Sequence, residues 1–168
     1  MRGFRPAWLL LPLGVFLADA GSKAWVLRHF TEREVLPVIP GFFNITLGFN
    51  PGAIFGSLQG AHPGLRGLIF TVAGLVALGY FGWEFTRPQT PSLQRWALGL
   101  ILGGILGNGA DRLAHGAVVD FLDFIFWGWH YWTFNLADSA IVCGAILMGL
   151  GLVKAARSAS EAHGGAGK

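Results

Sequence analysis

Apolar residues are gathered into long stretches along this chain, separated by segments in which polar residues return. Four stretches approach the roughly 20 residues that a helix needs to cross a bilayer. They cover residues 7–27, 65–85, 96–112 and 136–153. The third reaches this length only with its polar end. Only helices and closed barrels satisfy their backbone in lipid, and these stretches lack the alternation of barrel strands. The pattern therefore predicts four transmembrane helices.

Two intervening segments carry shorter patterns that are typical of β-strands. Residues 43–50 alternate apolar with polar or glycine positions, as in a half-buried strand. Residues 34–39 and 117–121 are further strand-like runs. The expected fold is a membrane all-α protein of four transmembrane helices with a small β-sheet. Glycine recurs at every fourth position from 99 to 107, which gives the third helix a smooth ridge for close packing.

The composition favours a membrane location. The chain has 168 residues, of which 53% are hydrophobic and 12% charged, whereas soluble domains carry about 25% charged residues. We expect a single domain over residues 1–168, with a flexible tail at about residues 158–168. No basic tract interleaved with aromatic residues supports nucleic-acid binding. Nothing in the sequence sets the oligomeric state, although a monomer fits a chain of this size.

Basic residues predict the orientation in the membrane, because cytoplasmic segments are enriched in Lys and Arg. The two termini and the loop between the second and third stretches carry the larger share: Arg2, Arg5, Arg87, Arg95, Lys154, Arg157 and Lys168. The bias is one of degree, since the other segments carry basic residues too. We therefore expect both termini in the cytoplasm. Residues 28–64 and 111–134, with the sheet, are expected on the outer side.

Acidic residues collect at the predicted outer edge of the membrane. The chain has nine Asp and Glu residues, and Asp19, Asp111, Asp120 and Asp138 all map to this level. Charge near lipid is costly and usually functional. Of two carboxylates in contact, one keeps a proton and acts as general acid, while the other acts as base toward water. Asp123 lies three residues from Asp120, so a strand turns it to the opposite face, and we expect an ordinary polar residue there.

Three polar pairs fall on shared helical faces in the same region: Asp19 with Lys23, Asn108 with Asp111, and Asn135 with Asp138. A structural alternative exists for two of these pairs. Asp19 and Lys23 can form a mutual ion pair, and Asp138 can complement the dipole at a helix N-terminus. His115 and His130 flank the acids but lack a compact metal-ligand spacing, so we expect no metal and no other cofactor.

Five motifs, in order along most of the chain, resemble those of the bacterial lipoprotein signal peptidases, also called signal peptidase II. They are DAGSK at residues 19–23, NPGAIFG at 50–56, GGILGNGADR at 103–112, VVDF at 118–121 and FNLADS at 134–139. The chain departs from the family pattern at Ala20, where Gln is usual, and at Trp132, where Pro is common. Each motif alone is modest evidence, whereas five in this order on four predicted spans are specific.

The resemblance implies an aspartyl endopeptidase of the bacterial cytoplasmic (inner) membrane, with its active site at the outer face. Its substrates would be prolipoproteins whose lipobox cysteine carries diacylglycerol, cut just before that cysteine and surrounded by membrane lipid. Asp120 and Asp138 would be the catalytic pair. Substrate-binding or supporting roles would fall to Asn50, Gly52, Asn108, Asp111, Arg112, Asn135, Asp19 and Lys23.

Two other classes of function are compatible with the same residues. Small proton- or ion-coupled transporters also carry intramembrane acids, but they often show internal repeats, and this sequence has none of about 20–50 residues. A non-catalytic lipoprotein-binding membrane protein would keep the same fold and bind the precursor without turnover.

Overall fold

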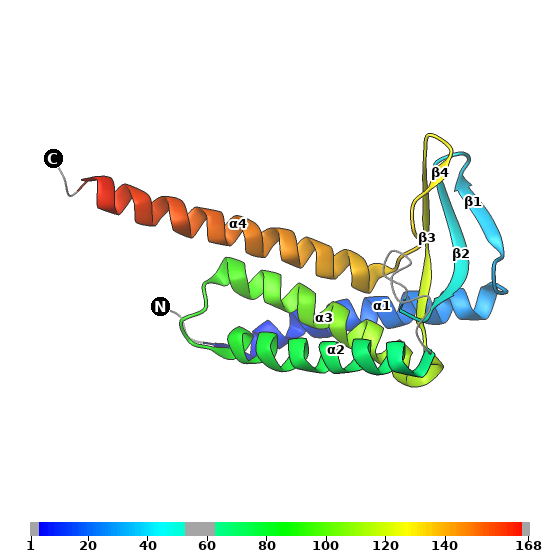
Figure 1. Ribbon diagram of the computed structural model, residues 1–168, viewed down its shortest axis with the longest axis horizontal. Helices are drawn as coiled ribbons and strands as arrows, with labels where there is room; N and C mark the ends of the chain where they lie inside the picture. Colours follow the sequence, from blue (N-terminus) through cyan, green and yellow to red (C-terminus); the bar gives the residue numbers. More distant parts are fainter. Residues whose placement is uncertain (1–3, 53–62, 166–168) are drawn as a thin grey trace.

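Four long helices form the body of the protein in the computed structural model, which describes residues 4–52 and 63–165. A short 3-10 helix leads into the first of them, and the order is η1 (Pro6–Leu9), α1 (Leu10–His29), α2 (Pro63–Thr86), α3 (Ser92–His115) and α4 (Leu136–Gly165). The helices run along the long axis of the molecule, and α4 extends beyond the others toward the C-terminus (Figure 1). At about 1.5 Å per residue, each is long enough to cross the hydrocarbon core of a bilayer.

Composition separates α3 from the other helices. Among the described residues, three helical stretches are apolar enough to cross a membrane: Pro6–His29, Gly67–Thr86 and Leu136–Ser158. α3 carries the polar residues Asn108, Asp111 and Arg112 near its C-terminal end. It is also the central helix, because it packs against α1, α2 and α4. These neighbours shield it from the surroundings, which explains how a less apolar helix is accommodated in the bundle.

The glycine ridge predicted on α3 is confirmed, and α1 packs directly against it. A Cβ atom at Gly103 would lie 2.5 Å from the Cβ of Val15, and one at Gly107 would overlap the carboxylate of Asp19. Only small residues allow two helix backbones to approach this closely. Because α1 also carries Lys23, the contact brings the charged residues of α1 to the polar end of α3.

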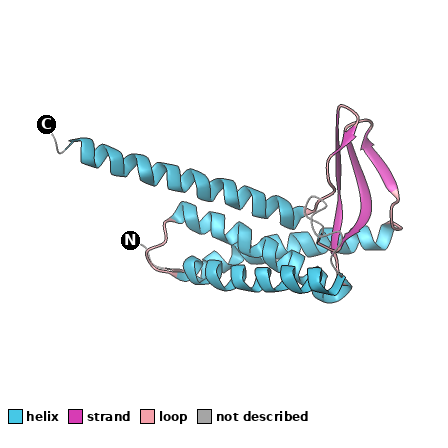
Figure 2. Ribbon diagram, viewed as in Figure 1, coloured by secondary structure: helices cyan, strands magenta, loops and turns pink. Residues whose placement is uncertain are grey.

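Within the described residues, an antiparallel sheet of four strands stands across one end of the helices (Figure 2). We call this end of the molecule the sheet end. The strand order is β1 (Val35–Ile39), β2 (Phe43–Asn50), β3 (Val118–Phe126) and β4 (Trp129–His130). The three strand predictions are confirmed, and β3 is longer than expected. Trp127 and Gly128 join β3 to β4, and both have positive φ, which suits the two-residue turn of a tight hairpin.

A small apolar cluster seats the sheet on the C-terminal end of α1. Val119 and Phe121 of β3 are buried together with Val26 of α1 and Leu47 of β2. Successive residues of a strand point to opposite faces, so Asp120 points away from this cluster. The packing of two apolar side chains thereby turns Asp120 toward the start of α4.

Candidate active site

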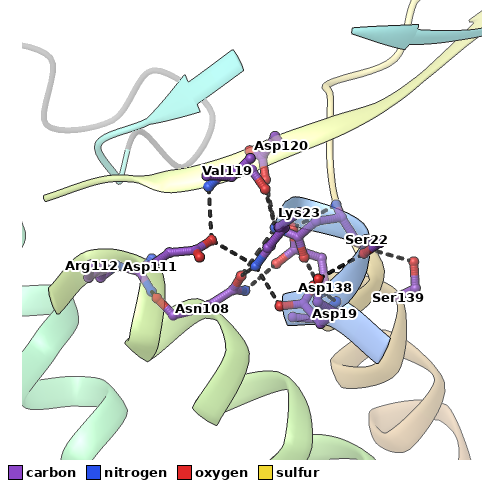
Figure 3. A network of polar contacts seen from close by, with 12 residues as sticks. Asp19, Ser22, Lys23, Asn108, Asp111, Arg112, Val119, Asp120, Asp138 and Ser139 are labelled. Atoms are coloured by element: carbon purple, nitrogen blue, oxygen red, sulfur yellow. Dashed lines mark hydrogen bonds and ion pairs between the residues drawn. The ribbon is translucent and has the colours of Figure 1, made fainter. Parts of the chain in front are cut away.

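Most of the polar residues singled out in the sequence are seen close together at the sheet end of the bundle (Figure 3). The helices and strands contribute them as follows: Asp19 and Lys23 from α1, Asn50 from β2, Asn108, Asp111 and Arg112 from α3, Asp120 from β3, and Asn135 and Asp138 at the start of α4. Gly52 follows β2, and its N–H donates to the side-chain oxygen of Asn50 at 3.0 Å. The structure therefore gathers all the predicted site residues in one place.

The first turn of α4 positions Asp138. The N–H of Asp138 donates to Oδ1 of Asn135 at 2.9 Å, and the N–H of Asn135 donates to Oδ2 of Asp138 at 3.3 Å. This reciprocal arrangement is a capping box, which satisfies backbone donors that a helix N-terminus leaves free. Oδ1 of Asp19 accepts a further donor, the N–H of Ala137, at 2.9 Å. Capping therefore fixes Asp138 in place, with its other carboxylate oxygen turned to α3.

Two asparagine side chains link Asp120 to Asp138. Nδ2 of Asn135 donates to Oδ1 of Asp120 at 2.7 Å, and Nδ2 of Asn108 donates to Oδ1 of Asp138 at 2.7 Å. The two amides are joined to each other, since Nδ2 of Asn135 also donates to Oδ1 of Asn108 at 3.1 Å. On the other side of Asp120, Nδ2 of Asn50 donates to Oδ2 at 3.0 Å. Fixed donors thus hold the two carboxylates as neighbours, and such preorganisation is what an acid–base site needs.

Burial and charge make Asp120 a weak acid. The residue is 2% exposed. Burial, and to a smaller degree the nearby charge of Asp138, raise the pKa of Asp120 to about 7, although hydrogen bonds from Asn50 and Asn135 favour its ionised form. Asp120 can therefore keep its proton up to about neutral pH, where an ordinary aspartate is ionised. A pair in this state can supply a general acid and a general base together.

Lys23 is the centre of a buried ion cluster beside the pair. Its Nζ lies 2.7 Å from Oδ2 of Asp19 and 2.8 Å from Oδ2 of Asp111, and donates to Oδ1 of Asn108 at 3.1 Å. The ammonium group thus makes two ion pairs and one hydrogen bond. Oδ2 of Asp111 also accepts the N–H of Val119 at 3.0 Å. The ion pair expected between Asp19 and Lys23 is therefore part of a larger cluster that ties α1 and α3 to β3.

An open cavity of about 630 Å³ lies between α2, α3 and α4. Its walls are mostly aliphatic and aromatic, with Phe70 of α2 and Leu106 of α3 among them. The guanidinium of Arg112 lies 5.5 Å from the ring centre of Phe70, and Arg112 lines the cavity together with Asp138. A cavity of this kind suits an apolar ligand that has one polar end.

A second cavity, of about 750 Å³, lies on the other side of Asp138, between β2, α4 and residues 131–134. Asp120 lines this cavity, whereas Asn50 and Asp138 line both cavities. A ligand can therefore reach Asp138 from either cavity and Asp120 from the second. Among the described residues, Lys23 lines neither cavity, which favours a structural role for it.

Asp123 differs from the expectation of an ordinary polar residue. It lies on the opposite face of β3 from Asp120, as predicted, but it is 4% exposed, and its carboxylate is hydrogen-bonded to Asn44 and His130. Sequence reasoning missed this set because the pairing depends on the register of β2 against β3. The described part of the chain holds no group of three or more His, Cys, Asp and Glu side chains that could bind a metal ion.

The fold and the site define a membrane enzyme. Two solved structures, both titled as a bacterial membrane enzyme, match the chain with TM-scores of 0.80 and 0.79. Each is 30% identical to it in sequence. The first match covers 91% of both chains, and the second covers 91% of this chain and 96% of the other. The helices and the sheet are therefore arranged as in a known enzyme of bacterial membranes.

Sequence relatives identify the family more closely. The family described as signal peptidase (SPase) II matches residues 11–154. The lipoprotein signal peptidase of Chromobacterium violaceum is 41% identical over 88% of this chain and 90% of its own. The lipoprotein signal peptidase of Yersinia pseudotuberculosis is 43% identical over 84% of this chain and 83% of its own. The chain belongs to the signal peptidase II family, a family of aspartyl-type peptidases.

Proposed function

We propose that Asp120 and Asp138 are the catalytic residues of this lipoprotein signal peptidase. The observation that carries the proposal is their position. Asn135 and Asn108 bind the two carboxylates at one edge of the bundle, where the two cavities meet. Membership of the family supplies the reaction, which is hydrolysis of a peptide bond. It also disfavours the transporter and the non-catalytic binding protein as functions.

The reaction proceeds through one water molecule and the two carboxylates. Asp138 removes a proton from water, and the hydroxide attacks the scissile carbonyl carbon. Asp120, whose raised pKa favours the protonated form, donates a hydrogen bond to the oxyanion that develops. The carbon–nitrogen bond then breaks, and the proton held by Asp138 passes to the leaving amine. Both carboxyl groups return to their starting state, so the cycle needs no metal and no other cofactor.

The remaining site residues have three roles in this proposal. Asn108 and Asn135 hold the carboxylates, and Gly52 orients Asn50 through its N–H. Asn50 lines both cavities, Arg112 lines the first, and both contact substrate. The structural group is the buried ion cluster, made of Asp19, Lys23 and Asp111.

The substrate is a prolipoprotein whose lipobox cysteine carries diacylglycerol, and the cut falls just before that cysteine. The apolar walls of the cavity between α2, α3 and α4 suit acyl chains, and Asp138 stands at the polar end of the same cavity. A lipid-modified cysteine bound there has its preceding peptide bond near the catalytic pair. Membrane lipid surrounds enzyme and substrate alike.

The protein forms one domain over residues 1–168 and crosses the bacterial inner membrane four times. α3 crosses the membrane in addition to the three more apolar helices, because these neighbours lie along it and cover it. The start of η1, the C-terminal end of α4 and the turn between α2 and α3 lie at the end opposite the sheet (Figure 1). Arg87 is in that turn, and Lys154 is in the C-terminal half of α4. The positive charge at that end favours a cytoplasmic location for it, which puts the active site at the outer face.

Cleavage of a defined lipopeptide tests the proposed function. The purified protein is incubated with a peptide whose cysteine carries diacylglycerol, and the products are weighed by mass spectrometry. We expect one cut, just before the modified cysteine, and no cut in the same peptide without the lipid. Equal cleavage of both peptides would contradict the substrate proposal. Binding of the lipopeptide without any turnover would indicate a non-catalytic binding protein.

A further inference from the structure

Asp123 is a buried carboxylate that lies outside the catalytic pair. Its Oδ2 accepts a hydrogen bond from Nδ2 of Asn44 at 2.7 Å, and Nδ1 of His130 lies 2.9 Å from Oδ1 and 3.0 Å from Oδ2. Asn44 is its direct partner on β2, and His130 is on β4. A buried charge is costly without such partners. The carboxylate therefore ties three strands together on the sheet face opposite Asp120.

His130 directly precedes the residues that line the second cavity. β4 has two residues, both exposed, and it ends at His130. The chain then returns along β3, where the N–H of Tyr131 donates to the carbonyl of Phe124 at 2.7 Å. Residues 131–134 are the stretch that lines the cavity beside Asp120. The position of His130 thus sets where this wall begins.

We propose that Asp123 is a positioning residue for substrate binding, acting through His130 on residues 131–134. The inference rests on the proposed function, since it assigns the cavity beside Asp120 to the peptide part of the substrate. Asp123 has no hydrogen bond to Asp120 or Asp138 in the described structure, so it acts on substrate affinity and not on the chemical step.

Three variants separate this role from a general loss of structure. Asp123→Asn removes the charge that His130 binds. His130→Phe keeps a ring of similar shape but removes the nitrogen, and it changes a side chain that is 63% exposed, so folding is spared. His130→Asn places an amide nitrogen where Nδ1 stands and restores the hydrogen bond. Glu34→Gln is the control, because Glu34 is an exposed carboxylate of the sheet region that binds Thr31 instead.

Affinity is measured with a diacylglyceryl peptide whose scissile amide is N-methylated, so that binding does not depend on turnover. We expect Asp123→Asn and His130→Phe to weaken binding about tenfold, the scale of one hydrogen bond to a charged group. His130→Asn and Glu34→Gln should bind as the unmutated protein does. With a cleavable peptide, the same two variants should raise KM and leave kcat close to its normal value.

Unchanged binding by the His130→Phe variant would overturn the proposal, and so would a fall in kcat at unchanged affinity. The unmutated protein is assayed alongside for turnover. A protein that binds the lipopeptide but never cleaves it contradicts the proposed reaction. Weaker binding by the two variants would still support the positioning role of Asp123.

Discussion

Asn135 and Asp138 cap one another at the start of α4, each donating its backbone N–H to the side chain of the other. The same Asn135 side chain donates to Asp120 at 2.7 Å. One residue therefore joins the helix cap to the carboxylate of a distant strand. The conformation of this helix end and the geometry of the carboxylate pair are set by the same hydrogen bonds.

Replacement of either carboxylate tests the catalytic pair. Asp120→Asn and Asp138→Asn keep the size of the side chain but remove a proton donor or acceptor. We expect turnover of the lipopeptide to fall by about 100-fold to 10,000-fold, the usual contribution of general acid–base catalysis. The lipopeptide should still bind. Glu84→Gln is the control, since Glu84 pairs with Arg87 at the opposite end of the bundle. Near-normal turnover in either aspartate variant would contradict the assignment.

The pKa of Asp120 predicts a pH dependence. Its value of about 7 lies above the ordinary 3.8, so the protonated form that the mechanism uses is lost as pH rises through about 7. We expect kcat/KM to fall on the alkaline side with an apparent pKa near that value. Asn50→Ala removes a donor that favours the ionised form, so it raises the pKa further and moves the alkaline limb to higher pH. Movement of that limb to lower pH would contradict this account.

Two glycines of α3 make a matched pair for packing. A Cβ at Gly107 would overlap the Asp19 carboxylate, whereas a Cβ at Gly109 meets nothing within 4 Å. We expect Gly107→Ala to lower the free energy of unfolding in detergent by about 1–3 kcal/mol, as overpacking does, and to lower activity. Gly109→Ala should be neutral or should stabilise the helix by about 1 kcal/mol. Equal stability of the two variants would argue against close contact between α1 and α3.

The ion cluster around Lys23 predicts a large effect of charge removal. Lys23→Met leaves the carboxylates of Asp19 and Asp111 without their cation. Breaking a buried ion pair from one side destabilises a protein by about 3–5 kcal/mol. We expect the free energy of unfolding in detergent to fall by that amount, or the variant to fail to fold. The exposed Lys154→Met variant should unfold like the unmutated protein. A stable Lys23→Met variant would show that the cluster does not hold the site.

Cysteine labelling tests the orientation. In a Cys143→Ser background, a single cysteine is placed at the exposed Val38 of β1 or the exposed Gln89 in the turn between α2 and α3. We expect a membrane-impermeant maleimide to label Val38→Cys in intact cells. Gln89→Cys should be labelled only after the membrane is opened. The reverse pattern would place the active site in the cytoplasm.

Local patterns in the sequence predicted most of the fold. Apolar length predicted the helices, and alternation predicted strands at residues 34–39 and 43–50, because both are properties of contiguous residues. α3 marks the limit of this reasoning. Its apolar stretch is short, and its central place among the helices depends on packing partners that no local window contains.

The sequence predicted only part of the candidate site as well. The sequence predicted a level in the membrane at which Asp120 and Asp138 both lie, but helical spacing alone paired Asp138 with Asn135. The resemblance to a peptidase family selected the two aspartates as the catalytic pair. The hydrogen bonds that connect them through Asn108 and Asn135 became visible only in the structure.

The sequence by itself determined the helices, the strands, the family and the gathering of acids at one end of the molecule. Only the tertiary structure decided which polar groups bind each other. Lys23 and Asn108 are 85 residues apart in the chain, and Asn44 and Asp123 are 79 apart. Such pairs are set by how helices pack and by the register of paired strands, and neither property belongs to any short segment of the chain.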